Sequence, residues 1–226
     1  MVKGPSKTYG DFIMIKAVIF DMDGVLIDTE KHYYTCWQKA AREFGFPFTG
    51  EHALMLRSLD AKEACKLMQG IFGEEFDYYA IRERRRELVK EALLQYGLEM
   101  KPEVKELLFL LREKGIKTAV ATATPMERTL EHLTKLGIAE LFDSIVSAKE
   151  VEHGKPAPDV YLYACKKIGM KPEDCIAVED SPNGIKSAYR AGLKPVMVPD
   201  LTEPDEETKK MLFACVNSLL KIGDLV

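Results

Sequence analysis

The residue types best suited to chemistry are two carboxylates, Asp21 and Asp23, which directly follow a short apolar run at residues 17–20. The run is continuous rather than alternating, which predicts a strand buried on both faces. Both acids then lie at the carboxyl end of this strand, the edge where ligands bind in open α/β sheets. Two carboxylates placed there suit a hard divalent cation, which prefers oxygen ligands.

An acidic turn before a helix is the structural alternative for the same stretch. Asp28 and Thr29 could cap a following helix, and Gly24 could supply a positive φ. Two acids joined to a buried strand repel each other unless a metal or a cationic side chain compensates them. This cost favours a functional role for Asp21 and Asp23.

Polar residues also follow two later apolar runs. Thr122 follows one of them, and the pair Glu179 and Asp180 follows the other. The Thr122 hydroxyl could donate a hydrogen bond to a ligand at this edge, whereas Thr124, which precedes a proline, is better suited to cap a helix. A capped acidic turn would explain residues 181–184 but would leave the paired acids without a role.

A lysine lies between glycine and proline in the loop that runs from His153 to Asp159. Lys155 would supply a positive charge at a fixed place. The two prolines stiffen the loop, and this lowers the entropy cost of ordering a long side chain. The alternative is an ordinary solvated lysine. We interpret His153 as a loop histidine, because nothing in the sequence pairs it with a base or a metal.

Four stretches resemble, in order, the four signatures of the haloacid dehalogenase-like (HAD) superfamily. They are DMDGVLIDT from Asp21, an apolar strand ending at Thr122, GKPAPD from Gly154 and VEDSPNG from Val178. The helical insertion described below and GKPAPD further resemble the β-phosphoglucomutase-like group of this superfamily. The resemblance covers nearly the whole chain from Met14 onward.

This resemblance implies phosphoryl transfer that depends on Mg²⁺ and passes through an aspartyl phosphate. Asp21 would attack phosphorus, and Asp23 would protonate the leaving oxygen and later deprotonate water. Thr122 and Lys155 would balance the charge of the phosphoryl group. The implied magnesium ligands are Asp21, the backbone carbonyl of Asp23, Asp180, and Glu179 either directly or through water. The implied substrate-binding residues are Gly24, Ala123 and Arg57.

From residue 102 the chain alternates between helical and strand patterns. Helices are expected at 102–115, 125–137, 159–169 and 183–192, and strands at 117–121, 144–146, 175–178 and 195–198. This β-α repetition predicts an α/β protein with a doubly wound, mostly parallel sheet.

Residues 30–99 carry helical patterns without a convincing strand. We expect helices at about 29–44, 52–69 and 76–95, and a segment of this length does not suit an ordinary crossover. The resemblance identifies it as a helical cap, of a size that implies small phosphorylated substrates. The predicted division is a core of residues 14–29 and 100–226, a cap of residues 30–99, and an N-terminal extension of residues 1–13 that we expect to be mobile.

One basic cluster lies in the predicted cap, in the sequence IRERRREL. We expect a solvated helix face, which is the ordinary role of such a charge run. The alternative is that one or two of these arginines face the active site and hold a phosphate or sugar hydroxyls, since guanidinium matches phosphate geometry. The arginines are Arg82, Arg84, Arg85 and Arg86.

The composition limits the kinds of partner. A formal net charge of −4 argues against nucleic acid or an acidic membrane surface and favours small solutes as partners. The resemblance implies that this solute is a small phosphorylated metabolite. Five cysteines without a C-x-x-C spacing fit reduced thiols, and no apolar run reaches the length of a membrane helix. We therefore expect a cytoplasmic protein, as a monomer or a weak dimer.

The choice between a phosphatase and a β-phosphoglucomutase depends on one position of the predicted cap. Sequences resembling the mutase carry a histidine five residues after Asp28, where this chain has Tyr33, and His32 lies about 100° away around the helix. LMLRSLDAKEA also lacks the G-x-S-R pattern of some mutases, although Arg57 and Ser58 could substitute in part. These departures favour a phosphatase and leave the mutase as the alternative.

A non-enzymatic alternative is a receiver domain of the response-regulator class, which also carries a phosphorylated aspartate on a doubly wound sheet. Such a domain is about half as long as this chain. It has neither a D-x-D pattern nor a helical insertion. The sequence therefore favours both the phosphatase and the mutase over a receiver domain.

Overall fold

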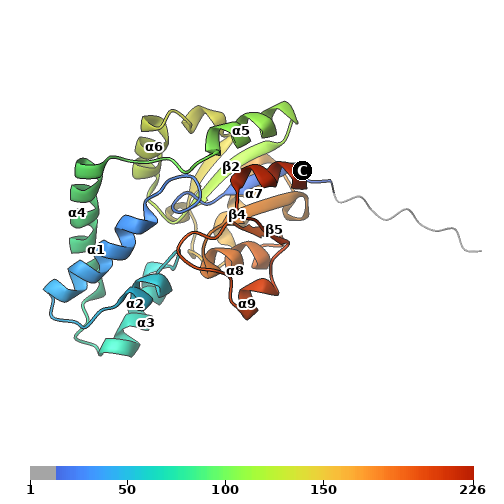
Figure 1. Cartoon of the computed structure of the whole chain (residues 1–226). Coiled ribbons are helices and arrows are strands. Elements are labelled where there is room, and N and C mark those ends of the chain that lie inside the picture. Colours follow the sequence, from blue (N-terminus) through green and yellow to red (C-terminus); the bar gives the residue numbers. More distant parts are fainter. Residues whose placement is uncertain (1–13) are drawn as a thin grey trace, which may run out of the picture.

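The computed structural model describes residues 14–226, so the predicted N-terminal extension lies outside the described residues. A six-stranded sheet occupies the centre, in the order β3-β2-β1-β4-β5-β6, and every neighbouring pair is parallel (Figure 1). The strands are β1 (Ala17–Phe20), β2 (Lys117–Thr122), β3 (Ser144–Ser147), β4 (Cys175–Glu179), β5 (Lys194–Met197) and β6 (Ala214–Cys215). The predicted fold class is confirmed. Only β6 has no counterpart in the prediction, because two residues carry no periodic signal.

The register of the three central strands brings their polar ends together. Phe20 of β1 pairs with Val120 of β2 on one side and with Val178 of β4 on the other. The residues that follow Phe20 and Val178 therefore emerge at the same edge of the sheet. All four residues of β1 are buried, as its continuous apolar sequence predicts.

Alternate residues of β1 supply two separate hydrophobic layers. Val18 and Phe20 pack on one face, with side chains of α5 (Val104–Glu113) and α6 (Met126–Lys135). Ala17 and Ile19 pack on the other, with side chains of α7 (Asp159–Ile168) and α8 (Pro182–Arg190). Because a strand alternates its side chains, one apolar run holds helices on both faces.

The chain completes the sheet with a short C-terminal region. The helix α9 (Glu206–Lys209) precedes β6, and a final 3₁₀ segment spans Leu219–Leu225. Leu219 and Ile222 of that segment belong to the hydrophobic layer under α5. Within residues 14–226, no helix has both the length and the apolar character that crossing a membrane would require.

Five helices separate β1 from β2 in the sequence, and the first four of them lie beside the sheet rather than on its faces (Figure 1). They are α1 (Glu30–Glu43), α2 (Gly50–Met55), α3 (Ala61–Phe72) and α4 (Tyr78–Tyr96). Their apolar side chains form a hydrophobic cluster of their own, which includes Trp37, Phe48, Met68 and Phe76. The helices pack mainly on one another.

The single helix predicted over 52–69 is wrong, because the chain breaks between α2 and α3. Asp60 begins α3 as its N-cap, and its side chain accepts a hydrogen bond from the backbone N–H of Lys62 at 2.8 Å. Ser58 has a positive φ of 52°, which an α-helix does not accommodate. The break directs residues 57–60 towards the end of the sheet.

Candidate active site

Asp21 lies directly after β1, almost completely buried, beside a buried lysine. The Lys155 Nζ donates to Asp21 Oδ1 at 2.6 Å, to Glu179 Oε1 at 2.7 Å and to the Ala121 carbonyl at 2.9 Å. Lys155 is 1% exposed, so the solvated alternative does not apply. Burial raises the pKa of Asp21 to about 8, against the attraction of Lys155 and together with repulsion from Glu179 and Asp23.

Asp23 has different surroundings, because hydroxyl groups hold its carboxylate. Thr29 Oγ1 donates to Asp23 Oδ1 at 2.5 Å, and Thr124 Oγ1 donates to Asp23 Oδ2 at 2.9 Å. The expected helix cap at Thr124 is wrong, since Pro125 is the N-cap of α6 and the Thr124 side chain turns to Asp23. Sequence reasoning assigned neither threonine to the site, although Thr29 belongs to the first HAD-like signature.

Thr122 ends β2 and is fully buried. Its hydroxyl accepts a hydrogen bond from the backbone N–H of Thr124 at 3.0 Å, which bends the chain after the strand. Ala123 and Thr124 then line the same pocket as Asp21. The hydroxyl of Thr122 keeps its proton for a further acceptor.

Three buried carboxylates come together at the edge of the sheet. Ligand oxygens of Asp21, Glu179 and Asp180 all lie within 4.8 Å of one another. Burial raises the pKa of Asp180 well above its usual range, and the neighbouring carboxylates add to this effect. Among the described residues, these three carboxylates share only Lys155 and Arg57 as cationic partners, and such a cluster of oxygen ligands fits a hard divalent cation such as Mg²⁺.

Gly24 lets the chain pass close to this acidic cluster. Its φ is +84°, and a Cβ placed on it would overlap the Asp180 carboxylate. Glycine is the residue that meets both conditions without strain. Gly24 thus approaches the predicted metal ligands with its backbone.

Glu179 is held by protein donors on several sides. Besides Lys155, it accepts hydrogen bonds from Tyr161 Oη at 2.6 Å and from Ser181 Oγ at 3.3 Å. These partners hold its carboxylate in the core, where it also fixes Lys155 next to Asp21. The side chain of Asp23 does not join the cluster of Asp21, Glu179 and Asp180.

Arg57, from the break between α2 and α3, reaches into the same region. It forms ion pairs with Asp180 and, at 3.3 Å, with Glu30, and it donates to Thr202 Oγ1 at 3.0 Å. Burial raises the pKa of Glu30 to about 7, although Arg57 opposes this rise. The guanidinium of Arg57 is therefore engaged with carboxylates at the wall of the pocket.

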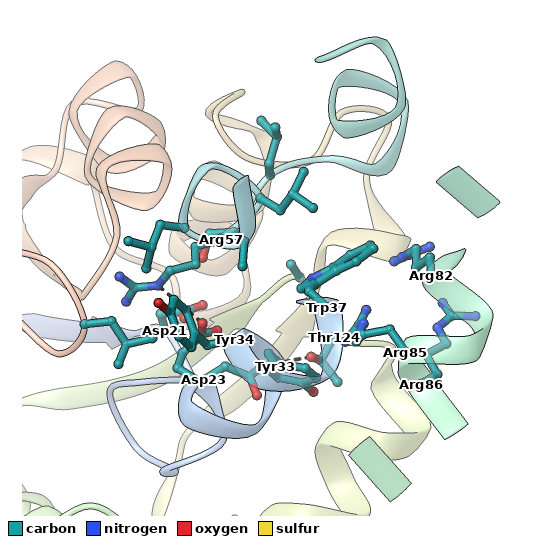
Figure 2. Close-up of a pocket in the computed structure, with 18 of the residues that line it drawn as sticks. Asp21, Asp23, Tyr33, Tyr34, Trp37, Arg57, Arg82, Arg85, Arg86 and Thr124 are labelled. Atoms are coloured by element: carbon teal, nitrogen blue, oxygen red, sulfur yellow. Dashed lines mark hydrogen bonds and ion pairs between the residues drawn. The ribbon is translucent and has the colours of Figure 1, made fainter. Parts of the chain in front are cut away.

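The pocket extends from these acids to the inserted helices (Figure 2). Three of the four clustered arginines line it, together with Arg128 of α6, and this favours the second interpretation of the cluster. Arg84 alone follows the first interpretation, since it pairs with Glu43 at 2.6 Å and with Glu87 at 2.8 Å on the surface. The lining arginines of α4 are Arg82, Arg85 and Arg86.

Tyr33 lines the pocket, and His32 does not. Burial raises the pKa of Tyr33 still further above its usual value. His32 stacks on Tyr96, with ring centroids 6.0 Å apart. The position expected for a mutase histidine is therefore occupied by a neutral phenol.

Comparison with known proteins assigns the class. The family described as haloacid dehalogenase-like hydrolase matches residues 18–198, which is most of the chain. The chain belongs to this family, and it is an enzyme of the β-phosphoglucomutase-like group, as the sequence resemblance implied.

Individual relatives support this assignment. A phosphorylated carbohydrates phosphatase of Thermotoga maritima is 32% identical over 80% of this chain and 83% of that protein. A β-phosphoglucomutase of Bacillus subtilis is 29% identical over 79% of this chain and 81% of that protein. The crystal structure of a β-phosphoglucomutase from Clostridium difficile superimposes with a TM-score of 0.76 at 25% identity, and covers 92% of this chain and 93% of that one.

Proposed function

We propose that the protein is a Mg²⁺-dependent phosphatase of small phosphorylated metabolites, in particular sugar phosphates. The observation that carries this proposal is the contrast between two carboxylates on one pocket: Asp21 rests against the Lys155 ammonium, and Asp23 accepts hydrogen bonds from two threonine hydroxyls. A nucleophile that receives a phosphoryl group needs a nearby positive charge to offset the negative charge of the phosphoryl oxygens. An acid-base group must lie within hydrogen-bond distance of the oxygen that gains or loses the proton.

Four groups of this chain would carry the reaction. A carboxylate oxygen of Asp21 attacks phosphorus and forms an aspartyl phosphate, while Asp23 gives a proton to the leaving alcohol oxygen. Asp23 then takes a proton from water, which attacks the aspartyl phosphate and releases inorganic phosphate. Lys155 and the Thr122 hydroxyl offset the negative charge of the phosphoryl oxygens throughout.

The acidic edge fits Mg²⁺ as the implied cofactor. Asp21 and Asp180, with the backbone carbonyl of Asp23, would hold the ion, and Glu179 would act directly or through water. When bound, Mg²⁺ would neutralise charge on the phosphoryl group and on the carboxylate cluster. Arg57 pairs with one carboxylate oxygen of Asp180, which leaves the other oxygen for the ion.

We also propose the predicted division into a core of residues 14–29 and 100–226 and a cap of residues 30–99. The separate hydrophobic cluster of the inserted helices supports it, since a domain buries its own apolar side chains. The pocket is lined by residues from both parts, so cap closure would exclude water from Asp21.

The partners and setting that we propose follow from charge and cysteine chemistry. A net charge of −4 disfavours nucleic acid and acidic membranes as partners, and we propose a monomer or weak dimer. All five cysteines are free thiols, including Cys165 and Cys175, whose sulfurs lie 3.9 Å apart. Free thiols at that distance support a reducing compartment such as the cytoplasm.

The hydrolase is favoured over the mutase by Tyr33. A phenol whose pKa lies above its usual value exchanges protons poorly near neutral pH, and His32 points to Tyr96 instead. The mutase remains the second candidate because the two activities differ only in whether water or a sugar hydroxyl accepts the phosphoryl group.

One experiment separates the two activities. The enzyme is given β-glucose 1-phosphate, Mg²⁺ and a trace of glucose 1,6-bisphosphate, and inorganic phosphate and glucose 6-phosphate are measured together. We expect phosphate release, and a panel of sugar phosphates and nucleotides should contain at least one that is cleaved efficiently. Rapid formation of glucose 6-phosphate with little free phosphate would overturn the proposal in favour of the mutase.

A further inference from the structure

The spacing of the arginines on α4 divides them between two sides of the helix. Arg85 and Arg86 follow Arg82 by three and four positions, so all three lie on one side of the helix, which lines the pocket. Arg84 lies on the opposite side, where Glu43 and Glu87 neutralise it. The helix thus presents three guanidinium groups to the pocket, of which Arg86 also pairs with Glu83, and the fourth, Arg84, is paired outside it.

Arg85 is buried without a carboxylate partner. It is 9% exposed and packs between two aromatic rings, with its guanidinium carbon 4.8 Å from the centroid of Tyr33 and 4.9 Å from that of Trp37. Its Nε has no hydrogen-bond acceptor, and no ion pair to Arg85 occurs within residues 14–226. Burial lowers the pKa of Arg85, and Arg82 and Arg86 add to this effect.

The surroundings of Arg85 do not supply the missing negative charge. In the part of the chain that the structure describes, Arg82 and Arg128 also form no ion pair, and Arg86 pairs with Glu83 at 2.6 Å. Figure 2 shows the α4 arginines at one end of the pocket and Asp21 and Asp23 at the other. A buried, unpaired cation lowers the stability of the protein, and an anion bound at this end of the pocket would compensate its charge.

We propose that the α4 end of the pocket binds a second acidic group of the substrate, a carboxylate or a second phosphate, with Arg85 as its main ligand. The inference rests on the proposed phosphatase function and narrows its substrate class to doubly anionic phosphate esters. The planar guanidinium fork matches both groups, and neutral sugar hydroxyls would leave its charge uncompensated. The rings of Tyr33 and Trp37 hold the fork in place.

The test compares substrates that differ in the second group. Glucose 6-phosphate has none, 6-phosphogluconate adds a carboxylate, and glucose 1,6-bisphosphate adds a phosphate. We expect the wild type to show a higher kcat/KM for one of the two acidic substrates than for glucose 6-phosphate, and the better of the two identifies the group. In Arg85→Met this preference should fall by about 10- to 100-fold, the value of a hydrogen bond to a charged group.

Two further variants make the test specific. Arg84→Met removes the same charge from the outer face of α4 and should keep the wild-type preference, whereas Arg85→Lys should recover only part of it, because an ammonium lacks the fork. If Arg85→Met does not fold, Arg82→Gln, which is more exposed, replaces it and should lower the preference in the same direction. An equal preference in wild type and the folded variants would overturn the inference.

A binding measurement separates this inference from the proposed function. The affinity of the wild-type protein for 6-phosphogluconate, glucose 1,6-bisphosphate and glucose 6-phosphate is measured by calorimetric titration. This measurement does not depend on whether the protein hydrolyses any of the three compounds. Tighter binding of an acidic compound that is lost in Arg85→Met supports the anion site even if no ester is hydrolysed. Equal binding of all three compounds would refute the site even if hydrolysis is fast.

Discussion

Two carboxylates separated by a single residue receive different surroundings in this protein. Asp21 is paired with a buried ammonium, and Asp23 is held by the hydroxyls of Thr29 and Thr124. An extended strand would turn residues two positions apart to the same face, but β1 ends at Phe20 and the chain bends after it, so the two side chains meet different partners. The proposed division into nucleophile and acid-base group rests on this contrast.

Replacing the proposed nucleophile tests the residue scale most directly. We expect Asp21→Asn to lower phosphatase turnover by at least about 10³-fold, because no carboxylate remains to form the aspartyl phosphate. Stability in chelator should stay the same or rise, since one of several buried like charges is removed. The measurements are phosphate release and urea unfolding. Near-normal turnover in a folded Asp21→Asn protein would rule out the mechanism.

The acidic edge predicts a metal requirement. Turnover should disappear in chelator and return with Mg²⁺, and Asp180→Ala should need a higher Mg²⁺ concentration or lose turnover. Mg²⁺ should also raise the melting temperature of the wild type but not of Asp180→Ala, because a ligand stabilises only the state that binds it. Glu173→Ala, which removes an exposed acid elsewhere, is the control. Undiminished hydrolysis after exhaustive chelation contradicts the proposal.

At the scale of elements, the start of α1 serves the site as well as the helix. Glu30 lies in the first turn of α1, where a negative charge interacts favourably with the helix dipole. It is also buried beside Arg57. Thr29, at the N-cap position, makes no cap hydrogen bond and donates to Asp23 instead. The Thr29 hydroxyl therefore holds Asp23 at the pocket instead of capping α1.

The raised pKa of Glu30, about 7, predicts how stability depends on pH. The folded state binds this proton more tightly than the unfolded state, so the stability gained is complete below about pH 4.5 and is lost as pH rises through 7. The free energy of unfolding of the wild type, relative to Glu30→Gln, should fall by up to about 1.4 kcal/mol per pH unit in this window.

Urea unfolding of both proteins in chelator, between about pH 5 and about pH 8, measures this slope. Comparing slopes removes the constant difference caused by replacing the side chain that pairs with Arg57. A difference that stays constant over the whole range would show that Glu30 is ionised in the folded protein throughout.

At the scale of the whole molecule, the loop between α2 and α3 connects the inserted helices to the rest. The backbone N–H of Asp60 donates to the Lys155 carbonyl at 2.8 Å, and Asn183 Nδ2 donates to the Arg57 carbonyl at 2.9 Å. These contacts lie beside the pocket, so they would have to break if the proposed cap opens to admit substrate.

A reversible cross-link can test whether opening is required. A Cβ placed on Gly154 would lie 3.2 Å from Asp60 Cβ, slightly less than the separation of about 3.5–4.5 Å found in disulfides, so a small shift of the loop would allow the bond. We expect the oxidised Asp60→Cys/Gly154→Cys protein to lose most of its turnover and to recover it in reductant, with the single variants as controls. Wild-type rates in fully cross-linked protein would show that the cap need not open.

Much of this architecture follows from local sequence patterns. The buried strands at 17–20 and 175–178, with acids directly after them, come from continuous apolar runs that end abruptly. Parallel pairing then gathers the strand ends at one edge without further information. For this reason the fold class and the meeting of Asp21, Glu179 and Asp180 were predictable from the sequence.

The tertiary structure alone decided which polar groups face the pocket. Arginines and apolar residues such as Ile81 and Leu88 alternate irregularly along α4, so its sequence shows no clean apolar stripe, and packing against α1 sets its rotation. That rotation turns Arg85 inward and Arg84 outward. The donation from Thr124 to Asp23 and the ion pair of Arg57 with Asp180 join residues more than a hundred positions apart, and no local pattern records such pairs.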